Sequence, residues 1–309
     1  MRIAIVGQRD FGKAAFEAFY TRGDDIAGVF CRPPSSDEPV DPLCEIAGQR
    51  GVKVFQFASL RAEEARRALR DLEVDLAVLA FVLQFVPQDF ASIPRHGTIQ
   101  YHPSLLPRYR GPSAINWAII RGERRTGLSI FRPTDGLDEG PVILQKETDI
   151  TPDDTLGKVY FDRLFPMGVN ALLEAADLVV SGQSRETAQD ESQATYEGWC
   201  KAPEAKIHWH SHIDQIYDLI RGCNPVPGAW TRFKGEKLQI FDAKKHPLRR
   251  FEEVRGPVGA VTAVGDQSFH VSVQGGEIEV FKVRSGAKKI SAAEFCREAG
   301  IAPGAVLDE

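Results

Sequence analysis

The first half of the chain alternates between short apolar runs and longer segments in which apolar residues recur every three or four positions. The apolar runs predict buried strands, and the periodic segments predict amphipathic helices. The predicted strands cover residues 2–7, 25–31, 52–57, 75–81, 98–101, 127–131 and 142–147. The predicted helices cover residues 11–23, 44–51, 60–74, 113–122 and 155–182. Strands that alternate with helices are typical of an α/β fold with a Rossmann-like, doubly wound, mostly parallel sheet.

The pattern changes after residue 182. Residues 182–198 are polar and nearly free of aliphatic side chains, which is typical of a linker. A predicted helix at 213–222 is then followed by short strands separated by glycine and charged turns. Such strands predict a small, OB-like β-barrel. We expect a Rossmann-like catalytic domain, a linker and a barrel-like domain at residues 1–189, 190–204 and 205–309.

The composition is that of an ordinary soluble globular protein, with 43% hydrophobic and 26% charged residues. No apolar run approaches the roughly 20 residues needed to cross a bilayer, so we expect no membrane contact. A formal net charge of −5 argues against nucleic-acid binding through an extended basic surface.

The five cysteines are widely scattered and include no C-x-x-C pair. Their odd number and spacing argue against a disulfide framework and against a zinc knuckle. We therefore expect a reduced, cytoplasmic protein.

Two motifs suggest ligands that the rest of the chain does not support. "GQRDFGKA" has the glycine and lysine spacing of a phosphate-binding loop, but Ala14 stands where Ser or Thr would bind magnesium. No G-x-G-x-x-G occurs to indicate a dinucleotide. "HWHSH" puts His208, His210 and His212 on one face if extended, as a metal site would need. Histidines beside a domain boundary are more often surface residues, so we expect no metal.

The stretch "IQYHPSLLPRYRG" combines a strand end with a polar loop. Period-two alternation places Gln100 and His102 on one face of the strand, and Pro103 ends it. Downstream, Asp138 lies in the glycine-flanked turn "DGLDEG" just before the next strand. Taken singly, His102 could be a structural histidine and Asp138 a turn former. Together they are candidates for one site.

The segments around these residues resemble a known family along nearly the whole chain. They are "HPSLLPRYRGPSAINWAI", "TGLSIF", "GLDEG", "LQKE", "PDDT", "AKIHW" and "IRGCNPVPGAW", in that order. With them the chain resembles the folate-dependent formyltransferase superfamily. "GQRDFGKAAF", "RHGTIQYHPSLLP", "ATYEG" and "RLFPMGV" look most like the hydrolase domain of 10-formyltetrahydrofolate dehydrogenases, which are related to methionyl-tRNA formyltransferases. The resemblance implies a Rossmann-like domain that holds 10-formyltetrahydrofolate and a barrel-like C-terminal domain.

The resemblance also implies roles for particular residues. The family's catalytic set is Asn-x-His plus the Asp of a G-L-D turn, and His102 and Asp138 occupy its last two positions. Gln100 replaces the asparagine and displaces the amide outward by one methylene. The hydrolase domain of the dehydrogenases also departs from asparagine here. Folate-ring contacts are expected at Asp138 and along the end of a parallel strand, at Gln84, Phe85 and Val86.

These groups fit attack on an N10-formyl carbon. Negative charge builds on the formyl oxygen, where protonated His102 or the Gln100 amide can stabilise it. Asp138 can orient the imidazole, or take a proton from the nucleophile directly or through a water. His102 can then protonate N10 as the tetrahedral intermediate collapses. Water as nucleophile gives formate and tetrahydrofolate, whereas an amine accepts the formyl group.

The acceptor is the open question. Methionyl-tRNA formyltransferases typically carry a basic insertion after the second strand, but residues 31–43 here hold three acidic residues and one arginine. Such a segment would repel phosphates, which argues against tRNA. We expect hydrolysis of 10-formyltetrahydrofolate. A formyltransferase for methionyl-tRNA or an amino sugar, and a folate binder without turnover, are the alternatives.

Two further points stay open from the sequence. Arg108 and Arg110 could meet the folate's glutamate tail or the acceptor, or merely be solvated. The oligomeric state, and whether the chain stands alone or is a domain of a longer protein, cannot be read from it.

Overall fold

The computed structural model describes residues 1–34, 39–248 and 256–308. The chain forms two compact units, each assembled from three stretches. The first comprises Met1–Gly111, Gly127–Thr148 and Phe161–Tyr196. The second comprises Pro112–Thr126, Asp149–Tyr160 and Glu197–Glu309. The contiguous domains expected at 1–189 and 205–309 stay a prediction.

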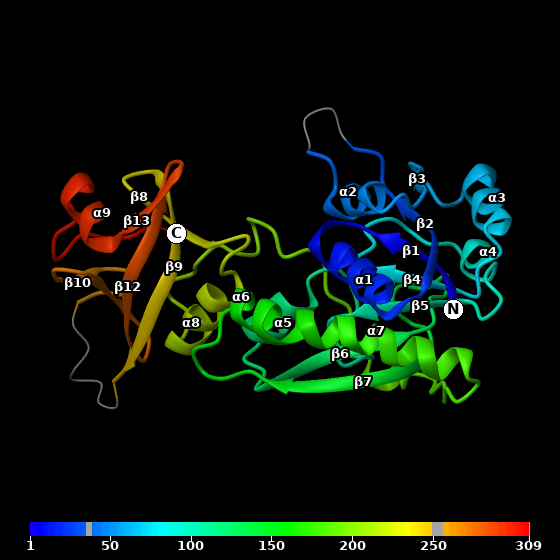
Figure 1. The fold of residues 1–309 in the computed structure, drawn as a ribbon. Coiled ribbons are helices and arrows are strands. Elements are labelled where there is room, and N and C mark those ends of the chain that lie inside the picture. The colour runs from blue at the N-terminus through cyan, green and yellow to red at the C-terminus, as the bar shows by residue number, and fades with distance from the viewer. Residues whose placement is uncertain (35–38, 249–255, 309) are drawn as a thin grey trace. The chain divides into compact units, whose positions relative to one another are not determined.

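A seven-stranded sheet forms the centre of the first unit (Figure 1). Its strands in chain order are β1 (Arg2–Gly7), β2 (Asp25–Cys31), β3 (Val54–Gln56), β4 (Leu76–Ala80), β5 (Thr98–His102), β6 (Arg125–Phe131) and β7 (Val142–Asp149). The spatial order is β3-β2-β1-β4-β5-β6-β7. Neighbours from β3 to β5 pair in parallel, and β5 pairs with β6 antiparallel. The fold is the expected doubly wound, mostly parallel sheet.

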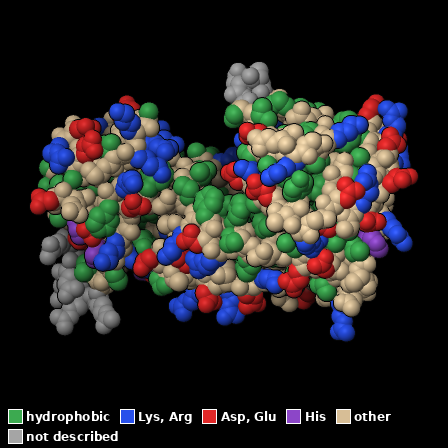
Figure 2. Space-filling model, viewed as in Figure 1, with side chains coloured by type: hydrophobic (Ala, Val, Ile, Leu, Met, Phe, Trp, Pro, Cys, Tyr) green, Lys and Arg blue, Asp and Glu red, His purple; other side chains and the backbone are tan. Residues whose placement is uncertain are grey.

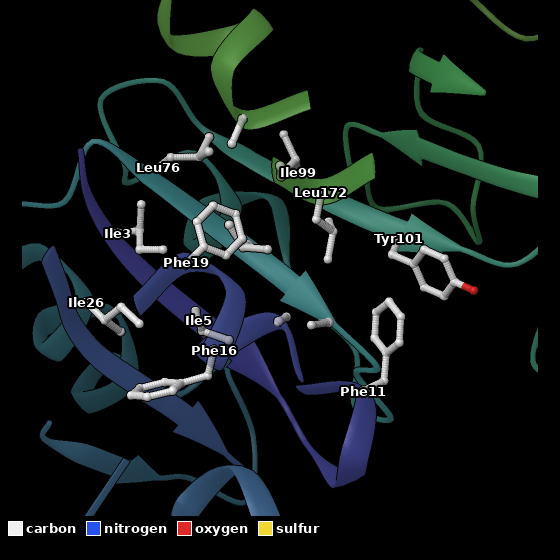
Figure 3. Close-up of a cluster of buried hydrophobic side chains, with 14 of the residues drawn as sticks. Ile3, Ile5, Phe11, Phe16, Phe19, Ile26, Leu76, Ile99, Tyr101 and Leu172 are labelled. Atoms are coloured by element: carbon white, nitrogen blue, oxygen red, sulfur yellow. The ribbon is translucent and has the colours of Figure 1, made fainter. Parts of the chain in front are cut away.

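Helices cover both faces of this sheet. They are α1 (Arg9–Arg22), α2 (Pro42–Gln49), α3 (Glu63–Asp71), α4 (Gln88–Ala91) and α7 (Phe165–Val180). Because side chains alternate along a strand, Ile3 and Ile5 of β1 join one apolar core with Phe16 of α1 (Figure 3), and Ala4 and Val6 join another. Burial on both faces explains why the parallel strands are almost continuously apolar.

Tyr101 of β5 belongs to the core under α1, where its ring stacks on that of Phe11 with centroids 4.3 Å apart (Figure 3). Its neighbours on the strand, Gln100 and His102, therefore face the opposite side of the sheet. This stacking fixes which face of the sheet receives the two polar side chains.

The expectation that all cysteines are reduced is wrong for one pair. Cys31, at the end of β2, and Cys44, in α2, form a disulfide. The two residues are 13 positions apart in the sequence, but the chain returns from β2 to a helix packed beside it. Cys200, Cys223 and Cys296 are free and buried.

The second unit contains a six-stranded antiparallel sheet and several helices (Figure 1). Its strands are β8 (Ala229–Phe233), β9 (Glu236–Pro247), β10 (Val261–Val264), β11 (Phe269–Val273), β12 (Gly276–Ser285) and β13 (Lys288–Ser291). Its helices are α5 (Ala114–Ile120), α6 (Leu156–Val159), α8 (Ile213–Gly222) and α9 (Ala292–Ala299). The order is β10-β11-β12-β9-β8, with β13 on β12.

The C-terminal segment joins the two ends of this sheet. Arg232 of β8 exchanges backbone hydrogen bonds with Asp308, while the N–H of Leu307 donates to the carbonyl of Gly259 just before β10. The edge strands are thus bridged, in keeping with the barrel-like character expected from the sequence. In the part of the chain that the structure describes, no helix has the length and apolarity to cross a membrane.

Candidate active site

His102 is buried at the carboxyl end of β5, with 5% of its surface exposed. The chain leaves the sheet at Pro103, and residues 103–111 form a loop, named here the 103–111 loop. Ser129 of β6 anchors this loop, because its hydroxyl donates to the carbonyl of Ser104 and accepts from the N–H of Leu106. The loop is therefore held against the sheet beside His102.

The 103–111 loop orients the imidazole. His102 Nε2 lies 2.8 Å from the carbonyl oxygen of Tyr109. A carbonyl only accepts hydrogen bonds, so Nε2 carries the proton and donates it there. This leaves the Nδ1 edge of the ring, which lies 3.5 Å from Asp138 Oδ2. The Nδ1 edge is the part of the ring available for chemistry.

Asp138 reaches His102 from the turn that follows β6. Its backbone is left-handed, with φ of 55°, a conformation that is costly for a residue other than glycine. The N–H of Gly111 donates to Oδ2 at 2.9 Å, and Gln100 Nε2 lies 3.4 Å from Oδ1. The structure thus brings Gln100, His102 and Asp138 together, as the sequence predicts, although their catalytic roles stay predictions.

The Gln100 amide contacts the Asp138 carboxylate through Nε2. The extra methylene of glutamine provides this reach. Gln100 is therefore placed to hold the Asp138 carboxylate in position. The sequence offered this amide as one of two groups that could stabilise a formyl oxygen, and that role stays a prediction.

The residues predicted to meet a folate ring lie on the loop after β4. Phe85 is 45% exposed, and the guanidinium of Arg61 lies 4.6 Å above its ring. Val86 is buried. Within the described residues, the buried Oε1 of Gln84 has no hydrogen-bond partner. A buried acceptor without a partner is costly, and a ligand N–H would satisfy it.

This loop is tied to the turn that carries Asp138. The N–H of Gln88 donates to Asp135 Oδ1 at 3.0 Å. The two loops expose four large apolar side chains, namely Phe81, Leu83, Phe85 and Leu137. An open depression of about 780 Å³ lies beside Phe85, which is the member of this set that lines it. It is lined by Arg61, Arg66, Phe85, Pro87, Gln88, Asp89, Ser92 and Asp135, so the catalytic candidates lie outside its wall.

Arg110 is not available to a ligand, which removes one of the two arginines considered from the sequence. Its side chain is fully buried. Its guanidinium donates to Gln189 Oε1, to both carboxylate oxygens of Glu191 and to the hydroxyl of Tyr196. The hydrogen bond from Arg110 lowers the pKa of Glu191, and the same bond raises the pKa of Arg110.

Sequence reasoning missed these partners of Arg110. Gln189, Glu191 and Tyr196 lie in the polar stretch interpreted as a linker, and only "ATYEG", quoted for the resemblance, marked any of them. The stretch in fact contains a short 3-10 helix, Glu191–Gln193, and forms a bridge between Arg110 and Tyr196.

The other motifs have structural explanations. A Cβ on Gly7 would lie 2.0 Å from the carbonyl oxygen of Ala80, so the first glycine of "GQRDFGKA" permits close packing of β1 on β4. His212 caps α8 by accepting from the N–H of Asp214. Among the described residues, no cluster of histidine, cysteine or acidic side chains could hold a metal ion.

Comparison with known proteins agrees with the fold. A formyl transferase family model matches residues 1–176, and a model of the formyl transferase C-terminal domain matches residues 200–300. The chain belongs to the formyl transferase family.

Two relatives illustrate the range of the family. Cytosolic 10-formyltetrahydrofolate dehydrogenase of Homo sapiens is 43% identical over 250 residues, which are 79% of this chain and 27% of that protein. This chain thus spans about a quarter of the dehydrogenases' length. Methionyl-tRNA formyltransferase of Geotalea uraniireducens (strain Rf4) is 31% identical and covers 99% of this chain and 98% of its own.

Solved structures share the fold at lower identity. HypX from Aquifex aeolicus in complex with tetrahydrofolic acid has a TM-score of 0.65 at 19% identity, covering 96% of this chain and 47% of its own. The N-formyltransferase from Helicobacter canadensis, in complex with folinic acid and dTDP-3-aminofucose, has a TM-score of 0.69 at 16% identity. It covers 90% of this chain and 98% of its own.

Proposed function

We propose that this chain hydrolyses 10-formyltetrahydrofolate to tetrahydrofolate and formate. His102 and Asp138 act on the substrate, and Gln100, the third catalytic candidate from the sequence, holds the Asp138 carboxylate. The observation that carries the proposal is the convergence of the His102 imidazole and the Asp138 carboxylate, 3.5 Å apart and both nearly buried. The identity of 43% to a 10-formyltetrahydrofolate dehydrogenase supports this substrate.

The folate ring binds at the loop after β4. Exposed Phe85 offers apolar surface, and Gln84 Oε1 offers an acceptor that no protein group uses among the described residues. The pteridine has flat apolar faces and N–H donors at its edge, so it matches both features. The side chain of Val86 packs into the core, so this residue offers the ring its backbone groups. The formyl group then extends toward the end of β5.

Asp138 activates the water. Among the residues that the structure describes, Gly111 donates to Oδ2, and Oδ1 has only the long contact with Gln100. An ionised carboxylate accepts about four hydrogen bonds, so room remains for a water proton. As the water oxygen bonds to the formyl carbon, this proton passes to Asp138.

His102 completes the reaction from its Nδ1 edge. The protonated ring stabilises the developing oxyanion, with Nε2 held by Tyr109. Its proton then passes to N10 as the C–N10 bond breaks, which releases tetrahydrofolate and formic acid. The proton held by Asp138 then passes to His102 through solvent or the formate product, which restores the ionised carboxylate and the protonated ring.

Transfer of the formyl group to an amine is the second candidate. The observation in its favour is the methionyl-tRNA formyltransferase relative, which matches 99% of this chain. Against a tRNA acceptor is the acidic stretch 31–43, of which Asp37 and Glu38 lie outside the described residues. Asp41, its third carboxylate, accepts from the N–H groups of Arg9 and Leu43. On the face drawn in Figure 2, acidic and basic side chains are interspersed.

The test is an acceptor screen with 10-formyltetrahydrofolate, in which formate and formylated products are measured together. Hydrolysis predicts formate release without an acceptor, and its loss in H102N and D138N. Formyl products that appear only with methionyl-tRNA or an amino-sugar nucleotide would replace the proposal with transfer. Binding of tetrahydrofolate without either product would leave the non-catalytic binder.

A further inference from the structure

Residues 189–196, named here the strap, lie across the 103–111 loop. The N–H of Tyr109 donates to Thr195 Oγ1 at 2.7 Å, and the N–H of Arg110 donates to the Thr195 carbonyl at 2.9 Å. The N–H of Thr195 donates in turn to the carbonyl of Pro107. The strap therefore fixes the residue whose carbonyl orients His102.

The strap also reaches the turn that carries Asp138. Gln189 Nε2 donates to the carbonyl of Asp138 at 2.8 Å and to the carbonyl of Gly140 at 2.7 Å. Its Oε1 accepts from Arg110 Nη2 at 2.8 Å. One amide thus joins the buried arginine of the loop to the backbone on both sides of Glu139.

This connection has a physical consequence for Asp138. Its left-handed backbone is costly for a residue other than glycine and persists only where surrounding contacts impose it. The two hydrogen bonds from Gln189 hold the carbonyls that define this turn. Without them the turn can relax, and its carboxylate moves away from Gly111 and His102.

We propose that Gln189 and Thr195 are positioning residues of the active site. They hold Asp138 and the Tyr109 carbonyl so that carboxylate and imidazole converge. The inference rests on the proposed function for its kinetic readout only, because the hydrogen bonds concerned can be followed without substrate. Two residues of the stretch interpreted as a linker then determine the geometry of the site.

The first experiment compares Q189M with Q193M. Methionine has nearly the size of glutamine but cannot donate to the two carbonyls. Gln193 is the matched control, because its exposed side chain donates to Asp190 and not to the 103–111 loop or the Asp138 turn, as far as the described residues extend. Misplacement of a catalytic group by about 1 Å costs on the order of 100-fold in rate. We expect kcat of Q189M to fall by about that factor with KM for 10-formyltetrahydrofolate within about twofold, and Q193M to match the wild type.

The second experiment compares T195V with T195S. Valine removes the acceptor of the Tyr109 N–H, whereas serine keeps it. We expect T195V to lose kcat several-fold and T195S to retain most of it. Rescue by the hydroxyl distinguishes positioning from a general effect of altering the strap, and the pair applies even if Q189M does not fold.

Amide hydrogen exchange at Gly111 gives a readout that needs no activity. Its N–H donates to Asp138 Oδ2, so its exchange should be faster in Q189M and unchanged in Q193M. Unchanged exchange and unchanged kcat in Q189M and T195V would overturn the positioning role. A wild type without turnover but with the expected exchange pattern would overturn the proposed function and keep the positioning role.

Discussion

The backbone N–H of Gly111 donates to the carboxylate of Asp138 at 2.9 Å, across 27 positions of sequence. The bond joins the turn after β6 to the 103–111 loop. The same loop accepts the Nε2 proton of His102 at Tyr109. Carboxylate and imidazole are therefore oriented by one loop, so their relative position does not depend on two independently moving segments.

Replacing the carboxylate tests this pair directly. In D138N the amide can still accept from Gly111, but it cannot take a proton from water. Loss of general acid–base catalysis typically costs about 10²–10⁴-fold, so we expect formate release to fall within that range. The melting temperature should change little, because the turn keeps its backbone hydrogen bonds.

The matched control for D138N is D177N. Asp177 is an exposed carboxylate that pairs with Arg22, and exposed ion pairs contribute little to stability. Equal losses of activity in both variants would contradict a specific role for Asp138.

Shortening the side chain of Gln100 tests whether residue 100 determines if water or an amine attacks the formyl group. Q100N restores the asparagine of the family pattern and removes the methylene that lets the amide reach Asp138. We expect the amide to turn toward the formyl oxygen and the ratio of formylated amine to formate to rise. The measurement is that ratio at saturating acceptor, and a ratio equal to that of the wild type would show that residue 100 does not select the acceptor.

The tight turn that contains Asp138 requires glycine at position 140. A Cβ on Gly140 would lie 1.6 Å from the carbonyl oxygen of Arg132. G140A therefore forces the backbone apart, and such overpacking typically costs about 1–3 kcal/mol. We expect lower stability in urea unfolding together with a loss of kcat.

The control for G140A is G48A, in which the new Cβ has open space on a helix. Alanine favours a helix over glycine by roughly 1 kcal/mol, so this variant should be as stable as the wild type or slightly more stable. A G140A enzyme with wild-type kcat would show that the turn tolerates movement.

The sequence predicted the first unit well for a physical reason. Parallel strands buried on both faces are nearly continuous apolar runs, as in "LAVLA" of β4, and they are hard to mistake. The antiparallel pairing of β5 with β6 was not predicted, because strand direction leaves no mark on hydrophobicity. Helix α9 was missed although Ser291 caps it and Gly300 ends it, both readable signals.

The sequence also predicted only some of the residues of the candidate site. His102 and Asp138 were paired through the family resemblance, since residues so far apart share no periodicity. Gln189 and Thr195 were missed because their contacts run from polar groups to backbone atoms. Such contacts bury little apolar surface, so the strap has the composition of a linker. The disulfide between Cys31 and Cys44 likewise depends on tertiary proximity.

The ion pair between Arg110 and Glu191 predicts a pH dependence of stability. The hydrogen bond from Arg110 lowers the pKa of Glu191 below its ordinary value of 4.5. A carboxylate with a depressed folded-state pKa stabilises the fold above its unfolded pKa, and this contribution is lost as pH falls through the folded value. The melting temperature of E191Q should therefore lie below that of the wild type at pH 7. The gap should begin to narrow as the pH falls below about 4.5 and should close once the pH has passed the lowered pKa of Glu191, where protonation removes the charge from the wild-type carboxylate. A gap that does not narrow with falling pH, or no gap at pH 7, would show that Glu191 does not stabilise the strap through its charge.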